Sequence, residues 1–318
     1  MDKTHETALL TIIIPFLNEG DEVRHTIHSI KETVSGNPYI ILINDASTDK
    51  YDYKRLAAEE ECLYINHNER KGVAASRNEG ITISSTTYFL LLDAHMRFYD
   101  KGWDIRLIDL LQQYPDSVLC AQTQKMEIDE SGEITTPKHR TCYGAYIEMG
   151  DDRLFKVNWC YTDPQPSDTC VEIACLLGAA YACSKEYWLH LHGLEGLIYY
   201  GSDEELLSTK VWCEGGKCIL VKDWIAGHLY RKAFPYMVPP KEMIYNRLFT
   251  IELFYPYSIK RKLFLNMQKY YGNSFEEAYK LLRSKYNLVK EERKYWNSIT
   301  KRSVDDFILW HKKLELLQ

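Results

Sequence analysis

The stretch Tyr88-Phe-Leu-Leu-Leu-Asp93-Ala94-His95 joins an apolar run to a carboxylate, a one-residue spacer and an imidazole. An apolar run bounded by polar residues is typical of a strand buried on both faces of a parallel sheet. Ligands of open α/β sheets bind beyond the carboxyl ends of such strands. The spacing of Asp93 and His95 places both side chains on one side of an extended chain. The pair therefore predicts half of a site for Mn²⁺ or a similar divalent ion; the plainer alternative is a helix cap and a local hydrogen bond.

The residues before this stretch predict alternating strands and helices. Apolar runs suited to buried strands cover 9–17, 39–43 and 62–65. Helical patterns lie between them, the first ending near 34 and the others covering 51–61 and 72–83. Pro15 is expected to stop the first strand, because proline cannot donate to a sheet ladder. The alternation predicts an α/β fold, with a Rossmann-like, mostly parallel central sheet flanked by helices.

The turns after these strands lack the usual glycine-rich phosphate loops. Neither G-x-G-x-x-G nor G-x-x-x-x-G-K-[ST] is present, so a nucleotide would bind through strand-end carboxylates and a metal. Asp45, at the end of the second strand, could accept a hydrogen bond from a base N–H. Arg70, Lys71 and Arg77 could face phosphate or sugar. Each of these residues could equally be a cap or a surface charge.

The second half of the chain is less regular. A helix is expected over 102–114, and strands over 117–121, 178–184 and 217–221. The irregular stretch 123–169 is where we expect acceptor selectivity, since loops around a site carry specificity. From about 241 the pattern is helical to the end.

An acidic cluster, Asp203-Glu204-Glu205, follows a glycine turn at the start of an expected helix. The helix dipole favours carboxylates at this end, which accounts for one or two of them. Three in a row leave room for a catalytic or acceptor-binding carboxylate.

The charge distribution limits the kind of partner. A net charge of −6 argues against nucleic acid. From Lys260 to the end the chain has 14 Lys and Arg against 7 Asp and Glu. This basic tail would touch an anionic membrane surface, mediate self-association, or simply be a solvated helical face.

The cysteines and the apolar runs point to the cytoplasm. Nine cysteines, with no C-x-x-C pair, do not form a disulfide framework in a chain of 318 residues. No signal peptide is expected, because the run 9–17 is short and broken by Pro15. No run approaches the length of a membrane span. We therefore expect a cytoplasmic protein with reduced thiols. Any contact with the inner membrane surface is expected to be peripheral.

Four stretches resemble the nucleotide-binding half of family 2-type GT-A glycosyltransferases: Ile13-Ile-Pro15-Phe-Leu-Asn18-Glu19, Ile43-Asn44-Asp45-Ala46-Ser47-Thr48-Asp49, Gly72-Val-Ala-Ala-Ser-Arg77-Asn78 and Leu91-Leu-Asp93-Ala94-His95. The second half is similar to the catalytic domain of polypeptide N-acetylgalactosaminyltransferases in Gly102-Trp103, in 178–212, and in Gly227-His228-Leu-Tyr-Arg231 with Pro235-Tyr236 and Asn246. The resemblance implies a GT-A domain over 1–255, divided near 122 into a nucleotide-binding half (1–122) and an acceptor and catalytic half (123–255). A basic helical extension covers 256–318.

The resemblance also implies roles for particular residues. Asp93, His95 and His228 would hold a divalent ion such as Mn²⁺ that bridges the diphosphate of a UDP-sugar. Cofactor contacts would come from Asp93 and Ala94, from Pro15, Glu19 and Asp45 around the uridine, and from Arg77 at the diphosphate or donor sugar. Arg231 and Tyr236 would lie on a loop that closes over the diphosphate. Catalytic carboxylates would be Asp203 or Glu204, within Tyr200-Gly201-Ser202-Asp203-Glu204, where the family has Trp-Gly-Gly-Glu-Asn.

The expected function is metal-dependent transfer of GalNAc, or another hexose or N-acetylhexosamine, from a UDP-sugar to a hydroxyl of a peptide, glycan or lipid-linked acceptor. Retention of anomeric configuration is slightly favoured. The alternative is an inverting family 2 enzyme of cell-surface polysaccharide synthesis, with Asp203 or Glu204 as base. Other classes are a nucleotidyltransferase, which would carry a basic glycine-rich loop after the first strand, and a non-catalytic protein that binds sugar nucleotides or glycans.

Overall fold

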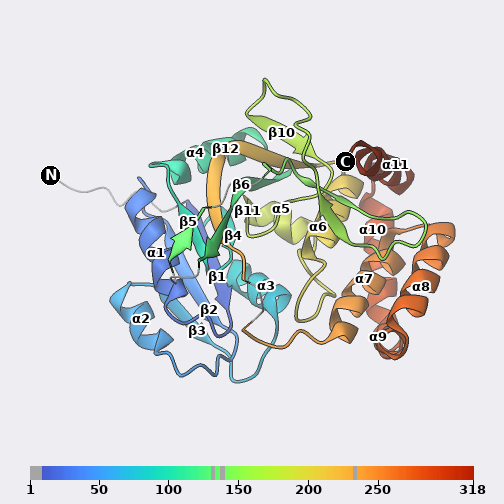
Figure 1. The fold of residues 1–318 in the computed structure, drawn as a ribbon, viewed down its shortest axis with the longest axis horizontal. Helices are drawn as coiled ribbons and strands as arrows, with labels where there is room; N and C mark the ends of the chain where they lie inside the picture. Colours follow the sequence, from blue (N-terminus) through green and yellow to red (C-terminus); the bar gives the residue numbers. More distant parts are fainter. Residues whose placement is uncertain (1–8, 130–132, 137–139, 232–234) are drawn as a thin grey trace.

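The computed structural model describes residues 9–129, 133–136, 140–231 and 235–318. Its first half alternates strands and helices: β1 (Leu10–Phe16), α1 (Glu22–Thr33), β2 (Tyr39–Asn44), α2 (Tyr53–Glu59), β3 (Leu63–Asn66), α3 (Val73–Ile83), β4 (Tyr88–Leu92), β5 (Met96–Phe98) and α4 (Trp103–Gln113). This part lies at the left of Figure 1, in blue to cyan. The predicted strands and helices of this half are therefore present, with ends shifted by a few residues.

The second half adds strands to this sheet, a separate two-stranded sheet formed by β8 and β9, and two helices. They are β6 (Ser117–Ile128), β7 (Ile134–Thr135), β8 (Ala145–Ile147), β9 (Val157–Trp159), β10 (Cys170–Ile173), β11 (Ala180–Ser184), α5 (Lys185–His190), α6 (Asp203–Glu214) and β12 (Lys217–Leu229). Five helices follow: α7 (Pro240–Phe254), α8 (Tyr257–Tyr271), α9 (Asn273–Ser284), α10 (Tyr286–Ile299) and α11 (Val304–Leu317).

The central sheet has the order β10-β12-β6-β11-β4-β1-β2-β3. Strands β4, β1, β2 and β3 are parallel, as expected for a βαβ series. Strand β11 runs antiparallel between β4 and β6, so the sheet as a whole is mixed. No helix separates β11 from β10 in the chain. A strand that is antiparallel to its neighbours needs no crossover helix.

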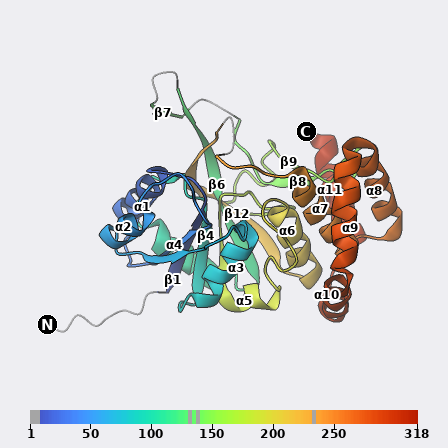
Figure 2. The same ribbon diagram turned by 90° about the horizontal axis from the view of Figure 1, so that it is seen from below.

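The apolar strands are buried on both faces, as their unbroken sequence predicted. Ile12 and Ile14 pack with α1, α2 and α4, whereas Ile13 packs on the opposite face with α3, α5 and α6. All three side chains are fully buried. Burying each contributes roughly 1.5–3 kcal/mol. Figure 2 shows helices on both sides of the strands.

The expectation that Pro15 ends the first strand was wrong. Pro15 does not stop β1, which runs to Phe16 and pairs with β2 up to Asn44. Side chains and amides alternate along a strand, and the Phe16 carbonyl accepts from the Asp45 amide on the β2 side. Pro15 therefore faces β4, where pairing with β1 has already ended at Ile13, and its missing N–H is not needed.

Strands β6 and β12 are longer than their sequences suggested. They pair in parallel over most of their length, with an irregularity between Val221 and Ile225. The polar residues Lys222 and Asp223, which made the strand seem to end, lie in this bulge. The continuation of β12 beyond the bulge brings His228 opposite Met96 of β5.

The tail 256–318 is helical, as predicted, and its apolar side chains join the core cluster on the α6 and α7 side of the sheet. Those that are buried include Leu263, Met267, Phe275, Trp296 and Phe307. The helices form the right-hand, orange-to-red part of Figure 1. In the part of the chain that the structure describes, every helix is too short or too polar to span a lipid bilayer.

Candidate active site

A cavity of about 620 Å³ opens beyond the carboxyl ends of β1 and β4. Its volume lies in the range of pockets that bind small molecules and cofactors. The structure brings every predicted site residue to its wall: Pro15, Glu19, Asp45, Arg77, Asp93, Ala94, His95, Asp203, Glu204, His228, Arg231 and Tyr236. Residues more than 200 positions apart in the chain therefore share one site.

The candidate metal centre consists of Asp93, His95 and His228. The first two follow β4, and the register of β12 with β5 places the third beside them. One ligand atom from each residue lies within 4.8 Å of the others. The Nε2 atoms of the two histidines are 3.1 Å apart, and His228 Nε2 is 3.7 Å from Asp93 Oδ2. Three potential ligand atoms thus converge on one point.

The hydrogen bonds and charges of these residues fit a divalent transition metal. Glu19 Oε2 lies 3.2 Å from His95 Nδ1, so Nδ1 carries the proton and Nε2 offers its lone pair to a cation. Burial, together with the neighbouring His95, lowers the pKa of His228 to about 4. His228 is therefore neutral at physiological pH, as a metal ligand must be. Two imidazoles with one carboxylate suit Mn²⁺ better than Mg²⁺.

Arg77 connects the metal centre to the start of α6. Its guanidinium is buried; Nη2 donates to Asp93 Oδ1 at 2.9 Å, and Nη1 donates to Asp203 and, at 2.9 Å, to Tyr181 Oη. Asp93 is thereby oriented toward the histidines. Asp203 is engaged by a cation, which makes it a weaker candidate for a general base than its neighbour.

Glu204 is the carboxylate of this cluster whose environment suits proton transfer. Burial raises its pKa well above the usual value, and Asp203 and Glu205 add to the shift. Gly178 leaves the space that Glu204 occupies, because a Cβ at this position would come within 2.1 Å of Oε1. A carboxyl with a raised pKa can accept or donate a proton near neutral pH.

Glu205 predicts a measurable pH dependence of stability. Burial raises the pKa of this carboxyl from 4.5 to about 7, against the opposing charge of Arg247. Since the folded state holds the proton more tightly, the contribution to stability is full below about pH 4.5 and is lost as pH rises through about 7. Between about pH 4.5 and 7 the wild type is expected to lose about 3 kcal/mol of unfolding free energy through this carboxyl. Glu205→Gln is expected not to show this loss. Urea unfolding of both proteins at pH 5 and pH 8 measures it; equal losses would contradict the assignment.

Arg231, Pro235 and Tyr236 line the cavity, and residues 232–234 between them lie outside the described part. Arg231 Nη2 donates to Glu19 Oε2 at 2.5 Å. Glu19 thus contacts both Arg231 and His95. Further along, Asn18 Nδ2 donates to the Pro235 carbonyl at 3.3 Å, and Arg70 Nη1 to the Met237 carbonyl at 2.7 Å. These contacts hold Arg231, Pro235 and Met237 on the nucleotide-binding half.

Asp45 makes more hydrogen bonds within the protein than its position at the end of a strand suggested. Its Oδ1 accepts from the Lys71 amide and lies against His67 Nδ1, both at 2.8 Å, and its Oδ2 accepts from the Gly72 amide at 2.8 Å. The carboxylate therefore shapes the loop before α3 while lining the cavity. His67 was not among the predicted residues, because nothing in its local sequence indicates this partner.

Several lining residues were not predicted from the sequence. Trp159, Tyr199, Tyr230, Met243 and Arg247 also line the cavity. They come from β9, from loops and from α7, and no role was predicted for them, although Tyr230 lies within the quoted stretch Gly227-His228-Leu-Tyr-Arg231. Their position depends on how the second half of the chain packs.

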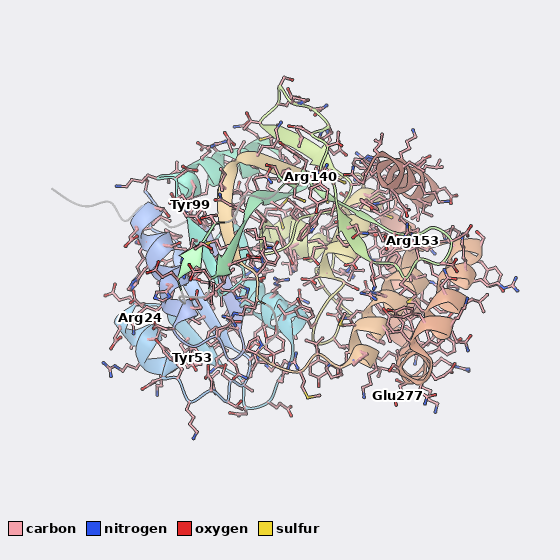
Figure 3. All side chains as sticks on the ribbon, in the orientation of Figure 1. Arg24, Tyr53, Tyr99, Arg140, Arg153 and Glu277 are labelled. Atoms are coloured by element: carbon pink, nitrogen blue, oxygen red, sulfur yellow. The ribbon has the colours of Figure 1, made fainter. Side chains whose placement is uncertain are left out.

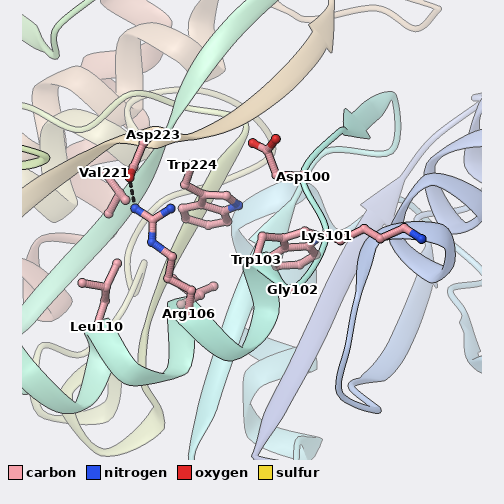
Figure 4. A pocket seen from close by; sticks show the side chains of 10 residues that line it. Asp100, Lys101, Gly102, Trp103, Arg106, Leu110, Val221, Asp223 and Trp224 are labelled. Atoms are coloured by element: carbon pink, nitrogen blue, oxygen red, sulfur yellow. Dashed lines mark hydrogen bonds and ion pairs between the residues drawn. The ribbon is translucent and has the colours of Figure 1, made fainter.

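A much smaller cavity, of about 50 Å³, lies between α4 and β12 and contains none of the predicted site residues. Figure 4 shows Trp103 and Trp224 beside the ion pair of Arg106 with Asp223. The two indole rings are stacked with centroids 5.8 Å apart. The space is too small for a nucleotide.

The overall architecture matches the GT-A fold. A crystal structure of GalNAc-T7 with UDP, GalNAc and Mn²⁺ superposes with a TM-score of 0.76 at 18% identity, covering 94% of this chain and 56% of that chain. S. aureus TarS, residues 1–349 in complex with UDP-GlcNAc, gives a TM-score of 0.51 at 9% identity, covering 91% and 90% of the two chains. At these identities the similarity concerns the fold.

Residues 11–167 match the family model described as glycosyl transferase family 2. Polypeptide N-acetylgalactosaminyltransferase 10 of Homo sapiens is 26% identical over 242 residues, which cover 72% of this chain and 39% of that protein. Polypeptide N-acetylgalactosaminyltransferase 14 of Homo sapiens is 24% identical, covering 72% and 42%. The matched region thus spans about two fifths of the length of these relatives.

Proposed function

We propose that this protein is a metal-dependent glycosyltransferase that moves GalNAc, or another hexose or N-acetylhexosamine, from a UDP-sugar to a hydroxyl of a peptide or glycan acceptor. The observation that carries the proposal is the convergence of Asp93, His95 and His228 in a cavity of nucleotide size. The family 2 match and the GalNAc-transferase relatives support the choice of donor.

The residues around the metal centre have separable tasks in this proposal. A bound divalent ion would neutralise the charge that develops on the leaving diphosphate. Arg77 holds Asp93 in place, and Glu19 holds the His95 ring in the tautomer that presents Nε2. Arg231, which lines the cavity, would present a second cation to the donor. A covered donor would be kept from water, which protects a reactive sugar.

Titration calorimetry of UDP tests the donor side. We expect UDP to bind in the presence of Mn²⁺ and to lose most of its affinity when EDTA removes the metal. Uridine alone should bind weakly, because it lacks the diphosphate. Equal UDP affinity with and without metal would overturn the proposal.

Retention of configuration is slightly favoured within this proposal. The ion pair of Asp203 with Arg77 supports it, since a paired carboxylate is a poor general base. Glu204 keeps the inverting alternative open, because its raised pKa suits a base. Analysis of the product anomer decides between them: an α-linkage from an α-donor supports retention, and a β-linkage identifies an inverting enzyme.

Two functions of other classes make different predictions. A non-catalytic sugar-nucleotide binder would bind UDP-sugar with Mn²⁺ but release no UDP. A nucleotidyltransferase would release pyrophosphate from UTP and a sugar phosphate. The glycosyltransferase assignment predicts UDP as the product and no pyrophosphate.

Arg231→Ala is expected to raise the KM for the UDP-sugar by about tenfold or more, because the variant loses a charge-assisted contact worth 1.5–3 kcal/mol. The structural cause is loss of the Arg231–Glu19 contact, which holds Arg231 against the nucleotide-binding half. Steady-state kinetics measure the effect, with Arg55→Ala, an exposed arginine on α2, as the control. Unchanged KM and kcat would show that Arg231 does not contribute to donor binding or turnover.

The location of the protein and its larger contacts are further proposals. We propose a cytoplasmic protein with reduced thiols, supported by nine cysteines that are all free in the structure. We also propose that the basic tail mediates peripheral contact with an anionic membrane surface, supported by its excess of Lys and Arg. Cosedimentation with phosphatidylglycerol vesicles tests the second proposal, and a dimer in light scattering would instead indicate self-association.

A further inference from the structure

Two cations line the part of the cavity that the second half of the chain supplies. Lys156 lies just before β9, and Arg247 lies on α7. Neither belongs to the metal centre or to the elements β1, β2 and β4 that bear the nucleotide-binding residues. Figure 2 shows β8 and β9 beside the C-terminal helices.

The C-terminal end of α8 contacts both of these cations. Lys156 Nζ is 5.8 Å from the centre of the Tyr270 ring, and Arg247 Nη1 donates to Tyr271 Oη at 2.9 Å. The two tyrosine rings are 4.8 Å apart, edge to face. Adjacent tyrosines thus place a lysine and an arginine at the same end of the cavity.

The loop before β9 is itself tied to the C-terminal helices. Arg153, labelled in Figure 3, pairs through Nε with Glu315 of α11 at 2.9 Å, and its carbonyl accepts from Asn266 of α8 at 3.0 Å. These contacts keep Lys156, three residues further on, on the cavity wall.

Both cations lack a paired carboxylate. Among the residues that the structure describes, neither Lys156 nor Arg247 forms an ion pair with a carboxylate. Arg247 is only 8% exposed, and its Nε has no hydrogen-bond partner. By contrast, Arg77 and Arg231 on the same cavity are paired with Asp203 and Glu19.

Glu205 interacts electrostatically with Arg247 and also lines the cavity. This carboxyl is buried and, being protonated over much of the acidic range, offsets only part of the positive charge. A buried guanidinium with an unused donor is costly until an anion satisfies it.

We propose that this end of the cavity binds the anionic group, a phosphate or a carboxylate, of an acidic acceptor. The inference rests on the proposed glycosyltransferase function and specifies its acceptor class. Arg247 supplies a planar set of donors suited to either anion, and Lys156 supplies a second charge at the rim. The acceptor hydroxyl would then be directed toward the donor side of the same cavity.

Calorimetry with the donor site filled tests this inference. The full chain, saturated with UDP and Mn²⁺, is titrated with glucose 6-phosphate, glucuronate and glucose. We expect at least one of the two anionic sugars to bind at least about tenfold more tightly than glucose, since hydrogen bonds to charged groups contribute 1.5–3 kcal/mol. Which of the two binds identifies the anion as phosphate or carboxylate.

Variants then assign the binding to these residues. Arg247→Gln and Lys156→Gln should each weaken the anionic sugar about tenfold, whereas Arg261→Gln on the exposed side of α8 should not. Lys156 is partly exposed, so its variant keeps the test valid if the Arg247 variant folds poorly. Equal binding of glucose and the anionic sugars, or unchanged binding in both variants, would overturn the inference. Failure of the wild type to bind UDP with Mn²⁺ would instead overturn the proposed function.

Discussion

His228→Ala is expected to lower metal-dependent turnover of the UDP-sugar by about 100-fold or more, a larger effect than the 10–100-fold typical of residues that only support metal ligands. The reason is geometric: His228 supplies one of three converging ligand atoms, and the Asp93–His95 pair alone leaves an incomplete site. UDP titrations with Mn²⁺ should show a parallel loss of affinity.

The fold should survive this change. His228 lies near the end of β12, and its Nδ1 makes no hydrogen bond whose loss would be felt. We expect unfolding free energy to fall by less than about 2 kcal/mol. His25→Ala, which removes an exposed histidine from α1, is the matched control. Turnover at the wild-type rate in the His228 variant would refute its role as a ligand.

Arg77→Met is expected to destabilise the protein by about 3 kcal/mol and to abolish use of the donor. Removing one member of a buried ion pair leaves uncompensated charge, at a typical cost of 3–5 kcal/mol. Asp203 is buried, and Asp93 is partly exposed, so we place the effect at the lower end. Urea unfolding measures the stability, and UDP release measures the activity.

Two further variants separate the structural effect from the catalytic one. Arg77→Met combined with Asp203→Asn should regain part of the stability, because one unpaired charge is gone, without regaining activity. Arg106→Met removes a solvent-exposed ion pair with Asp223 and should cost less than about 1 kcal/mol. An Arg77→Met protein as stable and active as the wild type would show that Arg77 neither supports Asp93 nor serves the donor.

The sheet and half of the metal centre could be predicted from local sequence. The run that ends at Asp93 has the unbroken apolar character of a strand buried on both faces, and Ile12, Ile13 and Ile14 show the same burial in β1. Strand ends were less predictable. Whether a residue such as Pro15 ends a strand depends on which neighbour its amide faces, and that neighbour comes from elsewhere in the chain.

The rest of the site depends on long-range packing. His228 reaches Asp93 because β12 continues beyond a bulge. The polar residues in this bulge made the strand seem to end before it. The pairing of Arg77 with Asp203 spans 126 positions, and no local pattern indicates it. The family resemblance placed His228 and Arg231 in the site, whereas Lys156 and Arg247 come from parts of the chain without a motif.

Release of UDP from a panel of UDP-sugars, measured with Mn²⁺ and with EDTA, tests the central claim most directly. We predict slow hydrolysis of at least one UDP-sugar without added acceptor, faster release with an acceptor, and no release in EDTA. Release that is indifferent to EDTA would contradict the metal centre. A wild-type protein that neither binds UDP with Mn²⁺ nor releases it from any donor would contradict the assignment as a glycosyltransferase.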